Sequence, residues 1–268
     1  MSIIEITYRE LLLTGTLVIA LAVCTVISKL GVARPLLIAA LRMAIQLTLV
    51  GMILNFIFTK SGILWVAGIS LVMLAVAGRE VAVRSKRPLA GWWGYAVGTG
   101  SMFVSSFAVA IFALAGMIRA DPWYEPQYAI PILGMLLGNT MNGIALSMDR
   151  LTDAAWRNRD EIEARLMLGE QGKTAIGDFA KDAVRSGLIP VINAMAVAGI
   201  VSLPGMMTGQ ILAGNDPSIA VKYQILIWLL IAAGCGFGML LAIRLTVHLL
   251  FDERHRLRLD RLKKPDRS

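Results

Sequence analysis

A long apolar run in the sequence reads Lys222-Tyr-Gln-Ile-Leu-Ile-Trp-Leu-Leu-Ile-Ala-Ala-Gly-Cys-Gly-Phe-Gly-Met-Leu-Leu-Ala-Ile-Arg-Leu-Thr-Val-His-Leu-Leu250. Between Tyr223 and Ile243 it contains no Asp, Glu, Lys or Arg. A helix needs about 20 predominantly apolar residues to cross the hydrocarbon core of a membrane. The run therefore predicts a transmembrane helix.

Six further segments approach the same criterion, and the composition agrees with them. The 268 residues are 57% hydrophobic and only 16% charged, which excludes an ordinary soluble domain. The 25 glycines favour closely packed helices over a β-barrel, whose strands would alternate apolar and polar residues. We predict an all-α polytopic bundle with about seven transmembrane spans: Leu11–Leu30, Leu36–Phe58, Ile63–Gly78, Trp93–Ile118, Ala129–Met148, Gly187–Leu212 and Lys222–Leu250.

The basic residues predict the orientation of these spans. Most of the 26 Lys and Arg residues lie in the intervals that follow the first, third, fifth and seventh spans. Cytoplasmic loops are the ones enriched in Lys and Arg, so we expect the N-terminus outside and the C-terminus in the cytoplasm. The basic tail, residues 251–268, is then expected to extend as a helix over anionic lipid headgroups of the inner membrane.

The long polar interval 149–186 falls on the predicted cytoplasmic side. It contains a charged amphipathic helix, Glu161–Glu170, which we expect to end at Gly169. An apolar stripe of Ile162, Leu166 and Met167 could seat in a groove on a soluble partner. The alternative is a helix that lies on the surface of the inner leaflet.

This helix resembles the loop by which ABC-transporter permeases engage their ATPase subunits, which carries a Glu-Ala-Ala…Gly pattern. The resemblance is partial, because Pro190 comes several residues later than in importers. It implies docking of a cytoplasmic ATPase on four coupling residues: Glu163, Ala164, Leu166 and Gly169.

A fragment of a phosphate-binding loop follows that helix but lacks the required context. Gly172-Lys173-Thr174 matches the end of the motif, whereas Met167 stands where the first glycine is needed. A helix, not a strand, precedes it. We therefore expect no nucleotide or other cofactor bound by this chain and no enzyme activity of its own.

The segment Leu203-Pro204-Gly205-Met206-Met207 extends the resemblance to a particular family. Together with Gly134-Met135 and Gly138-Asn139 upstream, and with Arg42 on the second span, it is similar to the FetB/UPF0014 permeases. These are iron-export subunits related to the aluminium-tolerance permeases of plants. The resemblance implies a single permease domain over residues 1–268 that pairs with a separate ATPase, where ATP and Mg would bind.

Polar and helix-breaking residues within the spans are candidates for a transport pathway. Polar side chains in a membrane are costly and usually face the bundle interior or a cavity. Proline and glycine should break the sixth span, because proline lacks an amide donor. The alternative is that the amides only tie helices together. The candidates are Arg42, Gln46, Asn139, Asn142, Asn193, Pro204, Gly205, Met206 and Met207.

No metal site follows from residue type. Met135 and Met141 could offer thioethers and Asp149 a carboxylate, but thioethers prefer Cu(I) to Fe(II). The two histidines, His248 and His255, lie far from these residues in sequence. Packing by methionine is the simpler interpretation.

The predicted function is the permease subunit of an ABC transporter that exports metal ions such as iron from the cell. Two copies of the chain would form the pathway in the inner membrane. One alternative is an ABC permease for a sugar nucleotide or other organic solute. Another is a secondary transporter or channel that works without ATP, although the spans carry few titratable groups for proton coupling.

Overall fold

The computed structural model describes residues 7–59 and 62–263. These residues form helices and three isolated β-bridges, and no strand occurs among them. Six helices are long and apolar enough to cross a membrane. The predicted all-helical membrane fold is thereby confirmed, while the orientation of the spans stays a prediction.

The chain divides into two compact units, each described here by itself. The first comprises residues 1–60 with 212–214 and holds two helices, α1 (Tyr8–Ile27) and α2 (Ala33–Thr59). Thr7 and Glu10 form a capping box at the start of α1, which satisfies backbone amides that have no partner within the helix. The two helices pack against each other as a hairpin.

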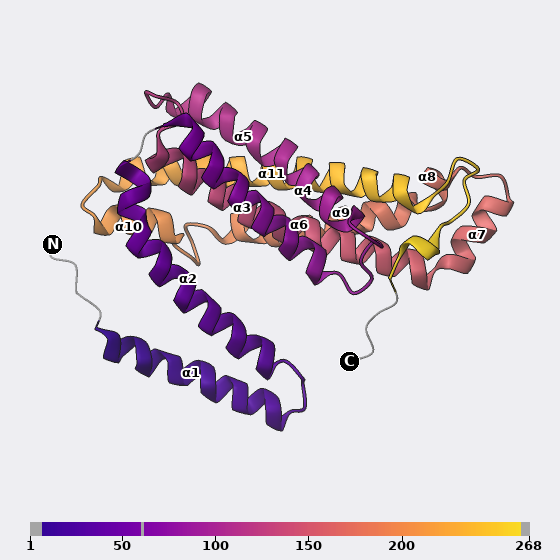
Figure 1. Ribbon diagram of the computed structural model, residues 1–268, viewed down its shortest axis with the longest axis horizontal. Helices are drawn as coiled ribbons and strands as arrows, with labels where there is room; N and C mark the ends of the chain where they lie inside the picture. Colours follow the sequence, from indigo (N-terminus) through magenta and orange to yellow (C-terminus); the bar gives the residue numbers. More distant parts are fainter. Residues whose placement is uncertain (1–6, 60–61, 264–268) are drawn as a thin grey trace. The chain divides into compact units, whose positions relative to one another are not determined.

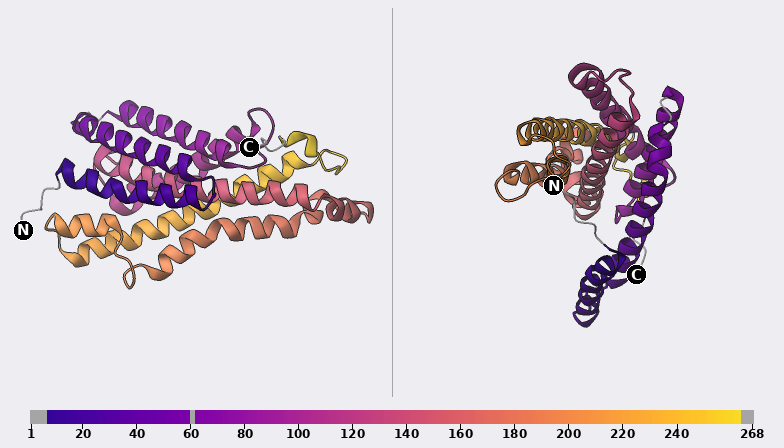
Figure 2. Two further views of the ribbon diagram at one scale, coloured as in Figure 1. Left: turned by 90° about the horizontal axis from the view of Figure 1, so that it is seen from below. Right: turned by 90° about the vertical axis from the view of Figure 1, so that its left-hand side faces the viewer.

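The second unit holds the remaining helices, which run largely side by side (Figures 1 and 2). The long helix α6 packs against α3, α9 and α11, and α11 also packs against α9 and α4. Their bounds are α3 Ile63–Arg84, α4 Trp93–Met102, α5 Ala108–Ile111, α6 Pro126–Arg157, α7 Arg159–Met167, α8 Gly172–Ala175, α9 Gly177–Val197, α10 Gly205–Leu212 and α11 Pro217–Leu250.

Two π-helical segments lie within the fourth span and do not break it. Phe103–Phe107 follows α4, and Phe112–Ile118 follows α5. The hydroxyl of buried Ser105 in the first segment donates to the carbonyl of Ser101, 2.8 Å away. The span Trp93–Ile118 therefore remains one continuous helical rod, as predicted, with two wide turns.

The predicted sixth span, Gly187–Leu212, is broken before Gly205, as its proline and glycine predicted, but its bounds differ from the prediction. Helix α9 begins ten residues earlier, at Gly177, and ends at Val197, whereas α10 begins at Gly205. Gly199 adopts φ +84°, and its amide donates to the carbonyl of Ser202. Leu203 precedes a proline and so disfavours the helical conformation. The backbone resumes a helix only after Pro204.

The tail beyond α11 corrects another prediction, because it does not continue as a helix. Phe251–Lys263 turns back, with only a short 3₁₀ helix at Leu259–Arg261. The amide of Lys263 donates to the carbonyl of Pro88, and the amide of Ala90 donates to that of Arg261. Burial of Leu89 and Leu262 explains the return. The last predicted tail residues, 264–268, lie outside the described residues.

The loop between α3 and α4 is fastened to α6 by polar contacts. Asp149 accepts a 2.6 Å hydrogen bond from the backbone amide of Lys86, and the hydroxyl of Ser85 lies 3.4 Å from the same oxygen. One turn further along α6, Asp153 pairs with Arg87, whose guanidinium lies 4.3 Å from the centre of the Trp156 ring. Asp149 thus has a structural task in this unit.

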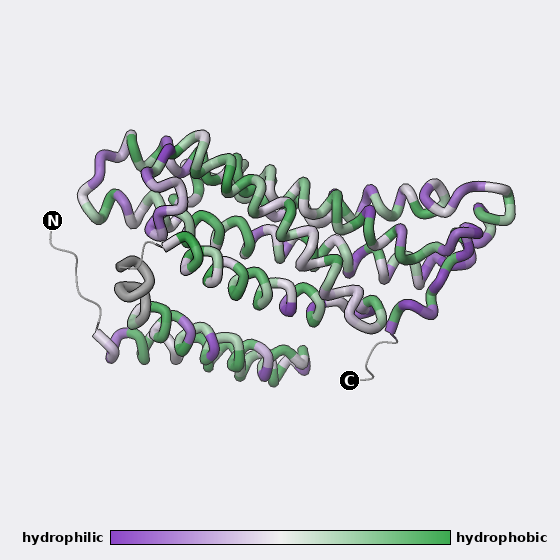
Figure 3. Tube along the Cα trace, turned by 45° about the horizontal axis from the view of Figure 1, so that its top comes forward, coloured by the Kyte–Doolittle hydropathy of each residue, from purple (hydrophilic) through white to green (hydrophobic). Residues whose placement is uncertain are grey.

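Hydrophilic residues of the second unit gather near α7, α8 and the tail, whereas the long helices are mostly hydrophobic (Figure 3). This separation is what a membrane demands, because polar groups are stable only where the helices leave the hydrocarbon.

Helices α6, α9 and α11 approach closely at two glycines, and this contact generates a first prediction. A Cβ atom on Gly187 would lie 2.5 Å from the Met239 sulfur and 2.9 Å from the carbonyl oxygen of Gly143. We expect Gly187→Ala to lower the free energy of unfolding by about 1–3 kcal/mol through overpacking. Gly236→Ala is the matched control, because its Cβ would meet nothing within 4 Å. Thermal unfolding in detergent measures both, and equal midpoints would contradict the close packing.

A second prediction concerns Asp149. We expect Asp149→Ala to lower the free energy of unfolding by about 0.5–1.5 kcal/mol, because the exposed backbone amide of Lys86 loses its hydrogen-bond acceptor. Asp149→Asn retains an oxygen acceptor and should recover most of that loss. If Asp149 were instead a metal ligand for transport, the Asn variant would fold normally and lose metal transport.

Candidate functional site

Helix α7 carries the predicted coupling residues at the polar end of the second unit (Figure 3). Glu163 and Ala164 are exposed, Leu166 is half-buried, and Ile162 is fully buried against its own chain. The predicted apolar stripe is therefore wrong in part, since Ile162 anchors the helix and cannot enter a partner. The exposed apolar side chains are Met167 and Leu168, at 83% and 86% exposure.

Arg165 ties α7 to α9. Its guanidinium lies 2.7 Å from the carboxylate of Glu161 on its own helix and 3.2 Å from that of Asp178 on α9. Asp178 is also 3.2 Å from the ammonium of Lys181. Hydrogen bonds from Lys181 and then Arg165 hold the pKa of Asp178 below its usual value. Arg165 thus connects α7 to the start of α9 through a solvent-exposed ion pair.

Helix α7 ends in the backbone motif that its glycine predicts. Gly169 adopts φ +94°, its amide donates to the carbonyl of Leu166, and the amide of Glu170 donates to that of Arg165. Three residues later, a Cβ on Gly172 would lie 2.5 Å from the ring of Phe251, so this glycine permits close contact. No strand precedes Lys173 within the described chain, so the context of a phosphate-binding loop is missing.

The predicted pathway residues occupy several separate places. Arg42 and Gln46 are exposed on α2 in the first unit. On α6, the amide of Asn139 donates to the carbonyl of Met135 in its own helix, and Asn142 accepts a 2.6 Å hydrogen bond from Arg84 on α3. Asn193 is exposed on α9. Their roles in transport stay predictions, because these contacts are also what helix-tying residues would make.

One cavity brings two of the predicted residues together. Met135 on α6 and Met206 at the start of α10 both line a space of about 530 Å³ between α6, α10 and α11. Met207 is half-buried on the same short helix, whereas Met141 lies further along α6 and outside the lining. Met206 reaches this cavity because the break before Gly205 separates α10 from α9, so that α10 does not continue in the direction of α9.

The polar lining of this cavity consists of amides and phenols. It includes Gln127 and Tyr128 from α6, Gln210 from α10, and Asn215 and Tyr223 at the start of α11. None of the lining residues is Asp, Glu, Lys, Arg or His. The Oε1 atom of Gln210 is buried and has no hydrogen-bond partner among the described residues. A ligand that brings a donor would satisfy it.

The described residues offer little to a bare metal ion. Among them, no three or more His, Cys, Asp or Glu side chains form a group that could hold a metal. Asp149 is engaged with the loop after α3, and Met135 and Met206 provide only thioethers. A cation could thus find weak, transient ligands here, but no all-protein site.

Sequence reasoning missed most residues of this cavity, although their spacing contained a usable signal. On α11, Ile219, Tyr223 and Ile227 recur every four residues and so share one helix face. Met206 and Gln210 do the same on α10. What the spacing could not supply was the direction of α10, which depends on the break before it.

Comparisons with known proteins place the chain among membrane proteins. Residues 8–251 match the model described as "Uncharacterised protein family (UPF0014)". A UPF0014 membrane protein of Synechocystis is 41% identical over 75% of this chain and 77% of its own length. The "Probable iron export permease protein FetB" of Escherichia coli is 30% identical over 97% of this chain and 98% of its own length.

A plant relative extends the same set. The "Protein ALUMINUM SENSITIVE 3" of Arabidopsis thaliana is 31% identical over 69% of this chain and 66% of its own length. No solved structure matches. The family match covers nearly all of the helices described above, from the first turn of α1 to the end of α11. This chain belongs to the UPF0014 family of membrane proteins.

Proposed function

We propose that this chain is the permease subunit of an ABC transporter that exports metal ions, with iron as the first cargo to test. A separate cytoplasmic ATPase would bind ATP and Mg and supply the energy. The name of the Escherichia coli relative supports the cargo. The observation that carries the ABC assignment is α7, a short charged helix that presents Met167 and Leu168 to solvent beside Glu163.

The proposed mechanism runs from α7 to the cavity. The ATPase docks on Glu163, Ala164, Leu166 and Gly169, and on the exposed pair Met167 and Leu168. Its closure moves α7, which is anchored by Ile162 and linked to Asp178 of α9 through Arg165. Helix α9 leads into the break at 198–204 and then into α10, which lines the cavity. The break is where α10 can shift without distorting α9.

The proposed assembly contains two copies of this chain and two ATPases in the inner membrane. One cycle of ATP-driven transport needs two transmembrane domains that move relative to each other, and each copy of this chain supplies one of them. A secondary transporter is less well supported, since no titratable carboxylate or imidazole lines the cavity between α6, α10 and α11.

The cavity lining supports a second candidate, an ABC permease for an organic solute. Tyr128 and Tyr223 provide aromatic faces, and the amides of Gln127, Gln210 and Asn215 can hydrogen-bond hydroxyl or amide groups. A sugar nucleotide fits only through its sugar, because the lining offers no cation to its phosphates. The metal reading would require a cation that keeps water or an organic ligand around it.

The docking surface gives a third prediction. We expect the purified wild-type chain to retain an ABC ATPase, and Met167→Glu with Leu168→Glu to reduce the retained amount at least about tenfold, because two charges enter a desolvated contact. Arg159→Glu, at the other end of α7, is the control and should retain the ATPase. Quantitative mass spectrometry and ATPase activity of the purified sample measure the ratio.

Two results would defeat this assignment. The wild type could purify without any ATPase from its own host, or the double variant could keep the wild-type ratio. Either result would leave α7 as a helix on the leaflet surface and would bring the ATP-independent transporter to the front.

The cavity gives a fourth prediction, tested in a host strain that lacks its own copy of this protein. We expect wild-type complementation to lower cellular iron and Gln210→Leu to abolish that effect, because the water or organic ligand that surrounds the cation loses a buried hydrogen-bond acceptor. Gln224→Leu is the matched control: its Oε1 is also buried without a described partner, but it does not line the cavity. Removing an unsatisfied polar group there should be tolerated.

Iron content measured in the same strain also distinguishes a metal cargo from an organic solute. If the wild type leaves cellular iron unchanged, the metal cargo is wrong and the organic solute becomes the hypothesis to pursue. If both glutamine variants fail equally, the cavity is not the cargo site.

A further inference from the structure

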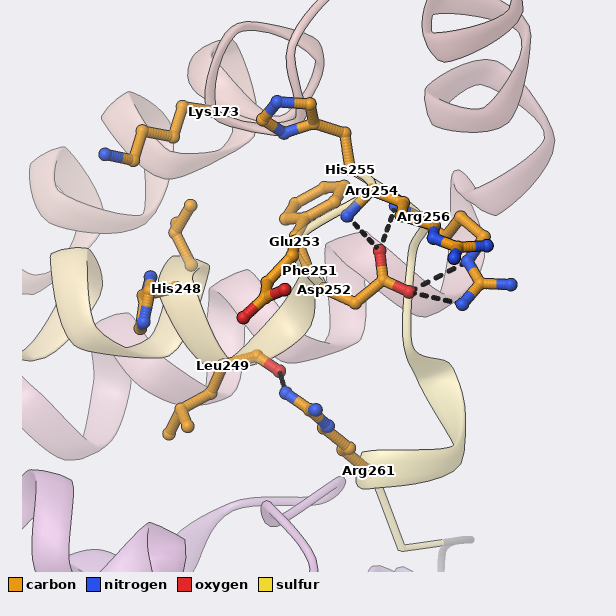
Figure 4. A pocket seen from close by; sticks show the side chains of 11 residues that line it. Lys173, His248, Leu249, Phe251, Asp252, Glu253, Arg254, His255, Arg256 and Arg261 are labelled. Atoms are coloured by element: carbon orange, nitrogen blue, oxygen red, sulfur yellow. Dashed lines mark hydrogen bonds and ion pairs between the residues drawn. The ribbon is translucent and has the colours of Figure 1, made fainter.

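A cavity of the second unit lies where α11 ends, beside α8 (Figure 4). Its volume is about 840 Å³, and both histidines of the chain line it. Lys173 comes from α8, His248 from the last turn of α11, and Arg254 and His255 from the turn that follows. Residues more than 80 positions apart thus form one wall.

Part of the polar lining is already used to build that wall. Asp252 accepts from the backbone amides of Arg254 and Arg256, at 3.0 and 2.8 Å, and from the guanidinium of Arg256 at 2.8 Å. These contacts, led by the Arg256 amide, hold the pKa of Asp252 below its usual value. Arg261 donates to the carbonyl of Leu249 at the end of α11. The turn is thereby fixed in shape before any ligand arrives (Figure 4).

The other cationic and imidazole groups remain available. The side chains of Lys173, His248, Arg254 and His255 are exposed and make no hydrogen bond or ion pair with any residue in the described ranges. Four Lys and Arg side chains line the cavity against two carboxylates, Asp252 and Glu253, which leaves a formal excess of two positive charges. Asp252 is neutralised by its contacts, so Glu253 is the remaining anion.

A metal ion does not explain this set of residues. Although two histidines and two carboxylates line the cavity, no three of these side chains gather into a group that could hold a metal within the described chain. Ammonium, guanidinium and imidazole donors instead match the oxygens of a phosphate group.

We propose that this cavity binds a phosphate-bearing anion, either a phospholipid headgroup or a soluble phosphorylated molecule. Lys173 and Arg254 would hold the charge from opposite parts of the chain, and His248 and His255 would donate hydrogen bonds. A bound anion would then join α8 to the end of α11, next to the proposed docking helix α7. The site is separate from the cargo cavity, and its test requires no ATPase.

The experiment uses the full chain and two phosphate probes. In an uncharged detergent, calorimetry measures the binding of inorganic pyrophosphate. In nanodiscs, thermal unfolding compares phosphatidylcholine alone with a mixture that contains phosphatidylglycerol. The cavity variant is Lys173→Gln with Arg254→Gln. The control, Arg258→Gln with Lys263→Gln, removes the same charge from tail residues outside the lining.

We expect the cavity variant to bind its probe at least about tenfold more weakly than wild type and the control to stay within about twofold, because direct charge-assisted hydrogen bonds are lost only in the first. Binding of pyrophosphate identifies a soluble phosphate as the ligand. A lipid headgroup is identified if pyrophosphate does not bind and the melting midpoint is higher in the mixture that contains phosphatidylglycerol than in phosphatidylcholine. His255→Asn provides a second cavity variant, because Asn tolerates the left-handed backbone at φ +56°. It should also weaken binding.

Three outcomes would overturn the proposal. The wild type could respond to neither probe, or the control could lose as much affinity as the cavity variant, which would indicate diffuse attraction only. The cavity variant could also bind as well as wild type. Equal elution volumes and equal melting midpoints without anion confirm that the variants are folded.

Discussion

Three helices meet around Met239, where Gly143 of α6 and Gly187 of α9 leave no room for side chains of their own. Without a hydrophobic driving force inside the lipid, helices associate through close packing of this kind. The position of α9 depends on this contact, and so does everything that α9 connects: the salt link from Arg165 at one end and the break before α10 at the other. A transport stroke proposed for this chain must either preserve the contact and rotate around it or exchange it for another of equal quality.

The sequence predicted the membrane class and most helices because hydropathy and helix periodicity are local properties. It predicted the break within Gly187–Leu212 but placed the start of that span ten residues too late, and the misplacement has a physical cause. Hydropathy marks where lipid begins, but α9 starts at Gly177, among charged residues that favour helix equally well outside the membrane. The end of α9 at Val197 depends on the backbone of Gly199 and the hydrogen bond to Ser202, which apolar composition conceals. Pro204 and Gly205 were visible, and they mark the start of α10, not the end of α9.

The candidate sites divide in the same way. Gly169 and the helix that it ends follow from local pattern, as does the pairing of Arg165 with Glu161 one turn away. The burial of Ile162 and the salt link to Asp178 do not, because they require α9 to be in place. The contact of the tail with the loop after α3 could not be predicted from the sequence. Leu262 pairs with Leu89, which lies far away in the chain, and no local sequence pattern relates the two residues. Once the tail returns, it gathers both histidines into one cavity.

The two backbone hydrogen bonds between the tail and the loop after α3 join residues 88–90 to 261–263 and so close the intervening chain into a ring. The ends of α3 and α11, and the start of α4, cannot separate unless these bonds and the buried Leu89–Leu262 contact are broken first. Helices that are fastened at one end can spread only at the other, and the far ends of α6 and α11 are where α10 and the amide-lined cavity lie. The tail therefore resists separation of the helix ends that it joins, and any rearrangement that keeps its contacts must take place away from them.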